Sequence, residues 1–323
     1  MQPGEVVGVG NAIVDVLVSI TDEFVEDQGL AKGSMALIDA DRAIELYDLL
    51  GSDAVKASGG SAANTAAGVA SFGGPASYIG KVNDDDLGRF FAQDMNSIGV
   101  RFEQPLAADG PTTAMCVVLV TPDAQRTMNT YLGVSALLEP ADVQPSAVEG
   151  ASLLFCEGYL WDVPSAKAAI RKAMDLGSAS GARVSLTLSD TFCVERHHAE
   201  FLDLVDGPVD VLFANRAELT RLYECELEDA VSRVAKTCDL AFVTLSEEGS
   251  LIVNQGDVIE IAAEPVDDVV DTTGAGDQYA AGVLYGLSQG MPLPEVGQLG
   301  SLAAAEVISH MGPRPIRPLS DFL

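Results

Sequence analysis

Short apolar runs alternate with amphipathic segments through the second half of the chain, and this alternation constrains the fold more than any other feature. The runs are rich in Val, Leu and Phe, and the segments between them carry apolar residues at helical spacing. Such alternation is typical of a parallel sheet with helices on both faces. The predicted strands are 153–156, 184–188, 209–214 and 240–245, and the predicted helices are 165–176, 199–204, 217–223 and 227–237. We therefore expect an α/β fold on a doubly wound, mostly parallel sheet.

The first half of the chain adds strands and two helices, but two of its segments break the pattern. Strands are expected at 6–9, 13–20, 76–79 and 113–120, and helices at 62–72 and 87–98. The segments at about 13–39 and 101–132 look β-rich, with turns and few helical signals, so they are not βαβ units. Neither an internal repeat nor a low-complexity linker divides the chain, which favours a single domain over residues 1–323.

The charge balance narrows the class of partner. The chain has 48 acidic and 18 basic residues and a formal net charge of −30. This composition argues against a nucleic-acid partner, which requires a basic surface, and disfavours binding to anionic membranes. The acidity is expected to solvate the surface, and adaptation to a salty medium stays open as an alternative. Because basic residues are scarce, each well-placed Arg or Lys gains interest as a ligand for an anionic substrate.

Two further observations bear on location. No apolar stretch reaches the roughly 18 residues of a membrane span, and residues 1–7 lack a basic, apolar signal segment. The cysteines have no metal or redox spacing, so we expect reduced, buried thiols in a cytoplasmic protein. They are Cys116, Cys156, Cys193, Cys225 and Cys238.

The segment 271–277 reads DTTGAGD and precedes a helical pattern. Gly274, Ala275 and Gly276 carry little side chain, so their N–H groups can surround an anion at the start of the helix. Asp277 would repel a bound phosphate, but it fits a base that takes a proton from a substrate hydroxyl while the amides hold the moving phosphoryl group. The alternative is a Gly-rich turn with Asp277 as a helix N-terminal carboxylate.

Two stretches near the N-terminus carry groups suited to binding hydroxyls. Asn11 and Asp15 stand at a strand break in the string GVGNAIVD, which lacks the third Gly of a dinucleotide fingerprint. Gly59 and Gly60 permit close approach of the backbone to a ligand, and Asn64 can donate and accept a hydrogen bond. The alternatives are a turn Asn with a solvated Asp, and a Gly turn before an Ala-rich packing helix.

These strings together resemble the ribokinase-like (PfkB) family of carbohydrate, adenosine and related kinases over nearly the whole chain. DTTGAGD resembles the family's C-terminal signature, and the segment 57–66 resembles its N-terminal signature, which continues through Gly80-Lys81 and 86–88. The resemblance implies an ATP-dependent kinase in which Asp277 deprotonates a primary hydroxyl. It also implies that the segments 13–39 and 101–132 form a small β-sheet lid over the active site.

The nucleotide side is assigned by the same resemblance. Asn215 and Glu218 follow a predicted strand and match an Asn-x-x-Glu motif that can order water around Mg²⁺ and the nucleotide phosphates, with helix capping as the alternative. Thr244 and Gly249 match a Thr-x-Gly-x-x-Gly loop on the ATP side, in which Ser246 replaces the first Gly. Thr273 and Gly276 are also expected beside the nucleotide.

Two charged residues complete the expected site. Asp271 matches a position that helps to hold a monovalent cation, such as K⁺, in the family. Segments 303–308 and 311–315 resemble the part of the family that borders adenine and this cation, with simple packing as the alternative. Arg126 lies in the second lid-like segment, where an Arg of the family stabilises the transferring phosphoryl group. A surface Arg is otherwise simply solvated.

The acceptor follows from the branch of the family that the chain resembles. The strings 8–15, 185–192 and 213–218 are closer to the bacterial adenosine-kinase-like branch than to the sugar kinases. The residues expected to line its apolar pocket are Ile13, Leu132, Val134 and Tyr159, of which Tyr159 can stack on a purine; lid and core packing is the alternative. We therefore expect adenosine or a similar nucleoside as the acceptor.

Other functions stay open at this point. A free sugar such as ribose or fructose is the alternative acceptor. A catalytically silent nucleotide-binding protein on the same fold is a second alternative, disfavoured by the intact DTTGAGD, and a dehydrogenase is disfavoured by the missing third Gly. The oligomeric state, monomer or homodimer, does not follow from the sequence.

Overall fold

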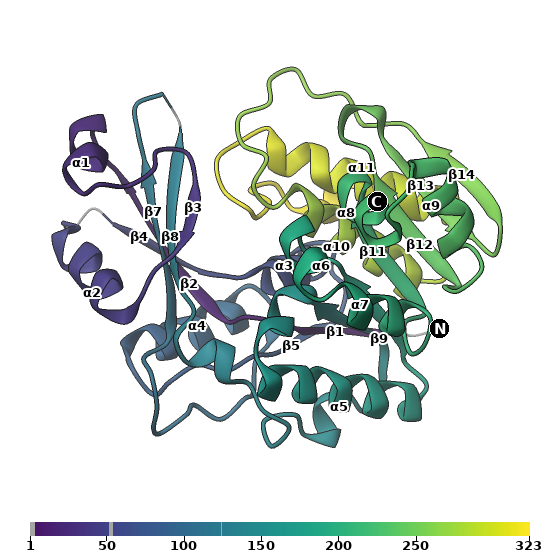
Figure 1. Cartoon of the computed structure of the whole chain (residues 1–323), viewed down its shortest axis with the longest axis horizontal. Coiled ribbons are helices and arrows are strands. Elements are labelled where there is room, and N and C mark those ends of the chain that lie inside the picture. The colour runs from purple at the N-terminus through teal and green to yellow at the C-terminus, as the bar shows by residue number, and fades with distance from the viewer. Residues whose placement is uncertain (1–3, 52–53, 124) are drawn as a thin grey trace.

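The computed structural model describes residues 4–51, 54–123 and 125–323, so part of the N-terminal segment used to judge a signal sequence lies outside it. Two sheets organise the chain, a nine-stranded sheet and a five-stranded one that stands beside it (Figure 1). Helices lie on both faces of the larger sheet, as the alternating pattern predicts. The expected fold class is therefore confirmed.

The larger sheet has the order β14-β13-β12-β11-β10-β9-β1-β5-β6. Its neighbours from β12 to β6 pair in parallel, and β13 and β14 add an antiparallel edge. The strands are β1 (Glu5–Val9), β5 (Ala76–Ile79), β6 (Val100–Arg101), β9 (Ala151–Glu157), β10 (Arg183–Thr187), β11 (Val211–Asn215), β12 (Leu240–Thr244), β13 (Ser250–Asn254) and β14 (Asp257–Ile261).

The position of β1 marks where a ligand is expected. From β1 the chain continues to β5 and β6 on one side, whereas β9 to β12 are added in turn on the other side. The strand order therefore reverses between β1 and β9. In open α/β sheets the crevice at the carboxyl ends of the strands beside such a reversal is the usual place for a ligand.

Adjacent residues of each strand point to opposite faces, which divides the core in two. Val7 and Leu154 pack with one set of helices, and Val6 and Leu153 with the other. The first set is α5 (Pro164–Ser180), α6 (Thr191–Arg196), α7 (His198–Val205), α8 (Arg216–Tyr223) and α9 (Leu227–Val234). The second set is α3 (Ser61–Ser71), α4 (Asp86–Ser97), α10 (Ala275–Ser288) and α11 (Leu293–Ile308).

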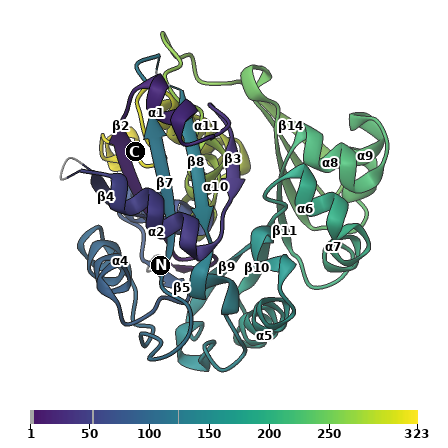
Figure 2. The same ribbon diagram turned by 60° about the vertical axis from the view of Figure 1, so that its left-hand side comes forward.

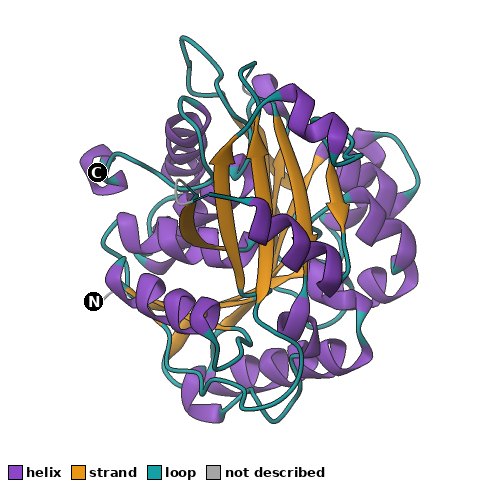
Figure 3. Cartoon of the chain, turned by 90° about the vertical axis from the view of Figure 1, so that its left-hand side faces the viewer, coloured by secondary structure: helices purple, strands orange, loops and turns teal. Residues whose placement is uncertain are grey.

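The smaller sheet has the order β3-β8-β7-β2-β4 and is seen face-on in Figure 3. Val14 and Val16 of β2 belong to one hydrophobic cluster with Ala43 and Leu46 of the helix beside them. Asp15 lies between them in sequence and therefore on the opposite face. The elements are β2 (Ile13–Ser19), α1 (Asp22–Asp27), β3 (Met35–Leu37), α2 (Ala40–Leu49), β4 (Val55–Gly59), β7 (Ala114–Val120) and β8 (Arg126–Tyr131).

Sheet membership corrects the predicted boundaries of the lid. The first lid segment runs on through α2 and β4 to Gly59 rather than ending at residue 39, and β6 belongs to the larger sheet, so the second segment enters the lid only at β7. α1 and α2 lie on the outer side of the smaller sheet (Figure 2). α1 was missed because a helix of six residues with one buried residue, Val25, is too short to show helical periodicity.

Two smaller expectations can also be compared with the structure. Within the described residues, no helix combines the length and the apolar character needed to cross a bilayer. All five cysteines are free; four are buried, and Cys225 is partly exposed.

Candidate active site

Asp277 lies in the first turn of α10 and contacts two residues of α3. Its Oδ1 accepts a hydrogen bond from the Ser61 hydroxyl at 2.6 Å, and its Oδ2 accepts one from Asn64 Nδ2 at 3.1 Å. Burial raises the pKa of Asp277 to about 6, although both hydrogen bonds and the charge of Arg314 oppose this shift. The carboxyl group is thus held in place and can exchange a proton near neutral pH.

The backbone before Asp277 has the geometry of an anion site. Gly274 caps α10 with φ +79°, a conformation that favours glycine, and a side chain there would meet Pro313 O at 2.5 Å. The Ala275 amide donates to Thr272 O. Contrary to the prediction, this amide is therefore not free to bind an anion. Among the described residues, the amides of Gly274 and Gly276 have no hydrogen-bond partner, and the space beside the Gly276 Cα is open.

Asp15, on β2 of the smaller sheet, lies close enough to Asp277 for the two charges to interact. Burial raises its pKa to about 6; Arg314 and Arg126 lower it, and the nearby charge of Asp277 raises it. Gly59 is paired with Ile13 across the sheet, and a Cβ on Gly59 would stand 2.4 Å from the Asp15 carboxylate. The glycine therefore leaves the room that this carboxylate occupies.

Asn11 lies directly after β1, where the strand order reverses. Its Nδ2 donates to Glu157 Oε1 at 2.9 Å, and its Oδ1 accepts from the Ser135 hydroxyl at 3.0 Å. Gly60 has φ +104°, and a side chain on it would meet Asn11 O at 2.1 Å. Because both polar atoms of the Asn11 side chain have protein partners, its contact with a substrate hydroxyl stays a prediction.

Glu157, at the carboxyl end of β9, was not among the predicted site residues. It is 1% exposed and accepts hydrogen bonds from Asn11 and from the Ala62 amide at the start of α3. Burial raises its pKa to about 7 against these hydrogen bonds. The only local indication that Glu157 belongs to the site is its position directly after the predicted strand 153–156. Many strands end in a Glu that has no role in a site, so this position does not identify it.

Arg126 and Asp271 join the smaller sheet to the segment 271–277. Arg126 Nη1 lies 3.1 Å from Asp271 Oδ2, and each side chain is 8% exposed. Asp271 also accepts from the Thr273 amide at 3.0 Å and the Gly312 amide at 2.9 Å. Burial opposes ionisation of Asp271, but these hydrogen bonds and Arg126 lower its pKa overall. Arg126 Nε and Nη2 are buried without a hydrogen-bond partner among the described residues.

Asn215 and Glu218, which are expected beside the nucleotide, form a capping box at the start of α8. Glu218 N donates to Asn215 Oδ1 at 2.8 Å, and Asn215 N donates to Glu218 Oε2 at 2.9 Å. Asn215 is the last residue of β11 and the N-cap of α8, and its Nδ2 donates to Glu218 Oε1 at 2.6 Å. Burial raises the pKa of Glu218 to about 7.

In the loop after β12, two residues have a backbone conformation with positive φ. Gly249 has φ +94°, and a side chain there would meet Ile261 O at 2.0 Å. Ser246, which replaces the expected Gly, has φ +55°. The backbone conformation expected of a glycine is therefore kept by a serine. Thr244 is the last residue of β12, next to Asn215 in the sheet.

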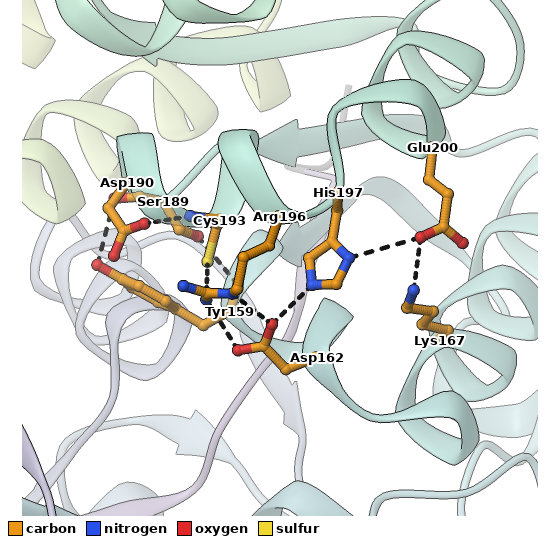
Figure 4. A network of polar contacts seen from close by, with 9 residues as sticks. All are labelled: Tyr159, Asp162, Lys167, Ser189, Asp190, Cys193, Arg196, His197 and Glu200. Atoms are coloured by element: carbon orange, nitrogen blue, oxygen red, sulfur yellow. Dashed lines mark hydrogen bonds and ion pairs between the residues drawn. The ribbon is translucent and has the colours of Figure 1, made fainter.

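The residues expected to line an apolar acceptor pocket differ in how far they are buried. Ile13 and Leu132 are partly exposed, whereas Val134 is 1% exposed and belongs to the packing. Tyr159 is partly buried, and its hydroxyl donates to Ser189 O at 3.2 Å (Figure 4). The contacts around it continue through Asp162, Arg196, His197, Glu200 and Lys167. Tyr159 itself is held by Ser189, whose hydroxyl accepts from the Tyr159 amide at 3.2 Å and whose carbonyl accepts from the Tyr159 hydroxyl.

Few side chains at this site are arranged to hold a resident metal ion. Within the described ranges, no group of three or more His, Cys, Asp or Glu side chains could hold a metal. Asn215 and Glu218 are bonded mainly to each other, and both Asp271 oxygens have N–H donors, one of them cationic. The donor set therefore fits contacts through water to an ion that arrives with a substrate, and does not fit a closed protein cage.

The structure brings together Asp277, Asp15 and Asn64 from separate parts of the chain. Ser61, Glu157 and Arg314 join them without having been predicted as site residues. A proton acceptor, unpartnered helix amides and a buried guanidinium suit the movement of an anionic group onto a hydroxyl. The fold and the site therefore define a kinase with an alcohol group as acceptor.

Comparisons with known proteins agree with this class. The model of the pfkB family of carbohydrate kinases matches residues 30–319. The chain belongs to this family, and its role as an ATP-dependent kinase acting on a hydroxyl, predicted from the sequence, is confirmed.

The relatives carry different names. The structure of adenosine kinase from Sinorhizobium meliloti is 48% identical to this chain, covers 99% of it and 98% of its own chain, and has a TM-score of 0.90. A probable sugar kinase from Rhizobium etli CFN 42 is 46% identical, covers 100% and 98%, and also has a TM-score of 0.90. The 5-dehydro-2-deoxygluconokinase of Geobacillus thermodenitrificans is 27% identical over 81% of this chain and 82% of its own length.

Proposed function

We propose that the chain transfers the γ-phosphoryl group of ATP to the primary hydroxyl of a nucleoside, with adenosine as the acceptor. The position of Asp277 carries the proposal, because a held carboxyl group with a pKa near 6 lies beside helix amides that have no partner. A base with a pKa near the working pH is efficient in proton transfer. The choice of adenosine is supported by the Sinorhizobium relative, which is named an adenosine kinase.

In the proposed reaction the acceptor O–H bond breaks and its proton passes to Asp277. The acceptor oxygen then bonds to the γ-phosphorus, while the bond from this phosphorus to the bridging oxygen breaks and ADP leaves. The amides of Gly274 and Gly276 hold oxygens of the moving group. Arg126 supplies two further donors, because its Nε and Nη2 have no partner among the described residues.

The acceptor is held by groups on both sides of the crevice. Asp15 and Asn64 face it, and Gly60 allows the backbone to approach closely. Tyr159 stacks on the purine in this proposal, since its ring is held by the hydroxyl contact to Ser189. The smaller sheet closes over the crevice and keeps water from competing as the acceptor.

Two ions belong to the proposal. Asn215 and Glu218 would hold Mg²⁺ through water, and the ion would neutralise charge on the phosphates of ATP. K⁺ binds beside Asp271 only when Arg126 has moved away from Asp271 Oδ2, because the guanidinium would repel it. We also propose a cytoplasmic location, in keeping with the five free cysteines, and a monomer or homodimer.

A sugar is the second candidate acceptor. The Rhizobium relative, nearly as similar as the Sinorhizobium protein, is named a probable sugar kinase, and the Geobacillus relative is a sugar-acid kinase by name. In that case Asp277 and the amides keep their roles, and Tyr159 and Leu132 serve only packing.

ADP release from Mg-ATP decides between these acceptors. The assay compares adenosine, inosine, cytidine, ribose and fructose, each with and without potassium. We expect turnover with adenosine well above that with the sugars. Preference for ribose or fructose would contradict the nucleoside assignment and leave the kinase class unchanged.

Replacing the base tests the mechanism itself. Asp277→Asn keeps the shape of the side chain but cannot accept the proton, so we expect the turnover rate to fall by about 10²- to 10⁴-fold. The KM for ATP should change little. Asp268→Asn, at an exposed position in the preceding segment, is the matched control and should behave as wild type. Near-normal turnover of the Asp277 variant would show that the assigned base is wrong.

A further inference from the structure

The loop that follows α11 is seated directly on the signature loop and on α10. The Gly312 amide donates to Asp271 Oδ2 at 2.9 Å, and Pro313 O accepts a hydrogen bond from Gln278 Nε2 at 3.0 Å. Gly274 makes room for this loop, since any side chain there would meet Pro313. These contacts place the next residue, Arg314, beside Asn64 and Ser58.

The Arg314 guanidinium connects three parts of the chain. Its Nε donates to Asn64 Oδ1 at 3.1 Å, and its Nη1 donates to the Ser58 hydroxyl at 2.9 Å. Asp94 Oδ2 lies 3.6 Å from Nη1 and also accepts from the Ser58 hydroxyl at 2.6 Å. The Arg314 side chain is 17% exposed, so these polar groups hold a charge that is largely withdrawn from water.

The contact with Asn64 has a consequence for Asp277. A guanidinium nitrogen can only donate, so Asn64 must turn its oxygen toward Arg314. The Asn64 amide nitrogen then faces Asp277 Oδ2, where it donates at 3.1 Å. The reversed amide would set its oxygen against a carboxylate and its N–H₂ group against a cation, and both contacts would be repulsive.

We propose that Arg314 is a positioning residue for phosphoryl transfer: it orients the Asn64 amide so that Asn64 and Ser61 together hold the Asp277 carboxylate toward the acceptor hydroxyl. This inference rests on the proposed role of Asp277 as the base. Arg314 acts through Asn64 and through its charge, and contacts neither the carboxylate nor the moving group. Without it, Asn64 can rotate and Asp277 loses one of its two hydrogen-bond donors.

The charges around Asp277 make this role visible in a pH profile. Arg314 lowers the pKa of Asp277, whereas burial raises it. Removing the cation leaves a carboxyl group among other acidic groups, so its pKa should rise further. The charged and titratable groups that interact with Asp277 are Arg314, Asp15, Glu157, Tyr78 and Tyr159, with Arg126 close to Asp15.

Two substitutions separate the donor from the charge. In Arg314→Gln the amide nitrogen occupies the chain position of Nε, so the donor to Asn64 is kept and the charge is lost. In Arg314→Lys the charge is kept, but a methylene group replaces Nε. Arg314→Met removes both. Arg317→Met is the control, because Arg317 is exposed on the same C-terminal segment and pairs with Asp321.

The measurements are kcat, the KM for each substrate, the pH dependence of kcat/KM, and thermal unfolding. We expect Arg314→Met to lower kcat roughly 10- to 100-fold, to raise the KM for the acceptor, and to move the acid limb to higher pH. Arg314→Gln should show the shifted limb with a smaller loss of kcat. Arg314→Lys should keep the wild-type limb with a clear loss of kcat. The KM for ATP should stay constant in all three.

Two results would overturn the inference. One is a wild-type kcat and pH profile in Arg314→Met. The other is a parallel loss of kcat, ATP affinity and thermal stability in all three variants with no shift of the acid limb, which would make Arg314 a structural clamp between the C-terminal loop and α4. If the wild-type enzyme prefers a sugar, the series is run with that sugar, so failure of the adenosine assignment and failure of the Arg314 role are told apart.

Discussion

At the scale of single residues, Glu157 shows how a site is built from groups that no local pattern identifies. Its carboxyl group is nearly inaccessible and connects the end of β1 with the start of α3 through Asn11 and Ala62. Gly10 leaves the space for it, since a side chain there would stand 2.3 Å from Glu157 Oε2. A buried carboxyl group in such a place makes stability depend on pH.

Glu157→Gln tests this dependence. The pKa of Glu157 rises from 4.5 to about 7 on burial, so the folded protein binds this proton more tightly than the unfolded chain does. The wild-type free energy of unfolding therefore falls as pH rises through this interval, by an amount on the order of 1–3 kcal/mol from this group. The variant should lose less stability than wild type over the same interval, as measured by urea unfolding.

The amide of this variant also places an N–H₂ group against one of the donors that Glu157 accepts, so a constant offset in stability is expected. The informative quantity is therefore how the difference in the free energy of unfolding between wild type and Glu157→Gln changes with pH. Glu149→Gln, at an exposed position, is the control and should run parallel to wild type. A pH-independent difference between wild type and Glu157→Gln would contradict the raised pKa.

At the scale of elements, the N-terminus of α10 combines two glycines with different duties. Gly274 has φ +79° and touches the C-terminal loop, whereas Gly276 has no atom within 4 Å of the position that a Cβ would take. Gly274 is required by its backbone conformation and by packing against the C-terminal loop. Gly276 leaves the space that the proposed phosphoryl group needs at the start of the helix. This difference is open to a paired test.

Gly274→Ala should lower the free energy of unfolding by about 1–2 kcal/mol from its backbone conformation alone, and further from the contact with Pro313 O. Gly276→Ala should leave stability unchanged or raise it by up to about 1 kcal/mol, because alanine favours the helix. Its methyl group nevertheless stands beside the free amides, so turnover should fall. Denaturant unfolding and ADP release, measured on both variants, check the pair; full activity in Gly276→Ala would argue against an anion at this helix end.

At the scale of the whole molecule, the net charge of −30 is the dominant feature. Repulsion among surface carboxylates destabilises the compact state, and salt screens it. Raising NaCl from about 0.1 M to about 1 M shortens the screening length from about 10 Å to about 3 Å. We therefore expect the thermal unfolding midpoint to rise with NaCl at neutral pH.

The control for this prediction is the same titration near the isoelectric point of about 4.1, where the net repulsion is small and the response should shrink. A midpoint that is flat or falls with salt at neutral pH would show that the exposed ion pairs, which salt weakens, outweigh the repulsion. Lys32 with Asp22 and Asp123 is one such group.

The secondary-structure predictions that the structure confirms were made from residues that lie close together in the sequence. The predicted strands 76–79 and 240–245, the second of which ends at Thr244, the helix now seen as α4 and the helix after DTTGAGD all follow from apolar spacing, caps and glycines within a few residues of each other. The lid boundaries were wrong where this information is weakest: α1 is very short, and β4 has exposed residues at its start.

The sequence by itself determined the parallel α/β sheet, the kinase class and Asp277 as the candidate base. The sheet follows from the order of apolar runs and helical segments along the chain, and the other two follow from signature strings such as DTTGAGD, so none of them requires knowledge of long-range contacts. Only the tertiary structure decided which groups surround that base. Ser61 lies 216 positions from Asp277, and Arg314 lies 250 positions from Asn64. No periodicity or motif links residues so far apart, and they meet because the strand order reverses at β1 and the C-terminal loop packs onto α10.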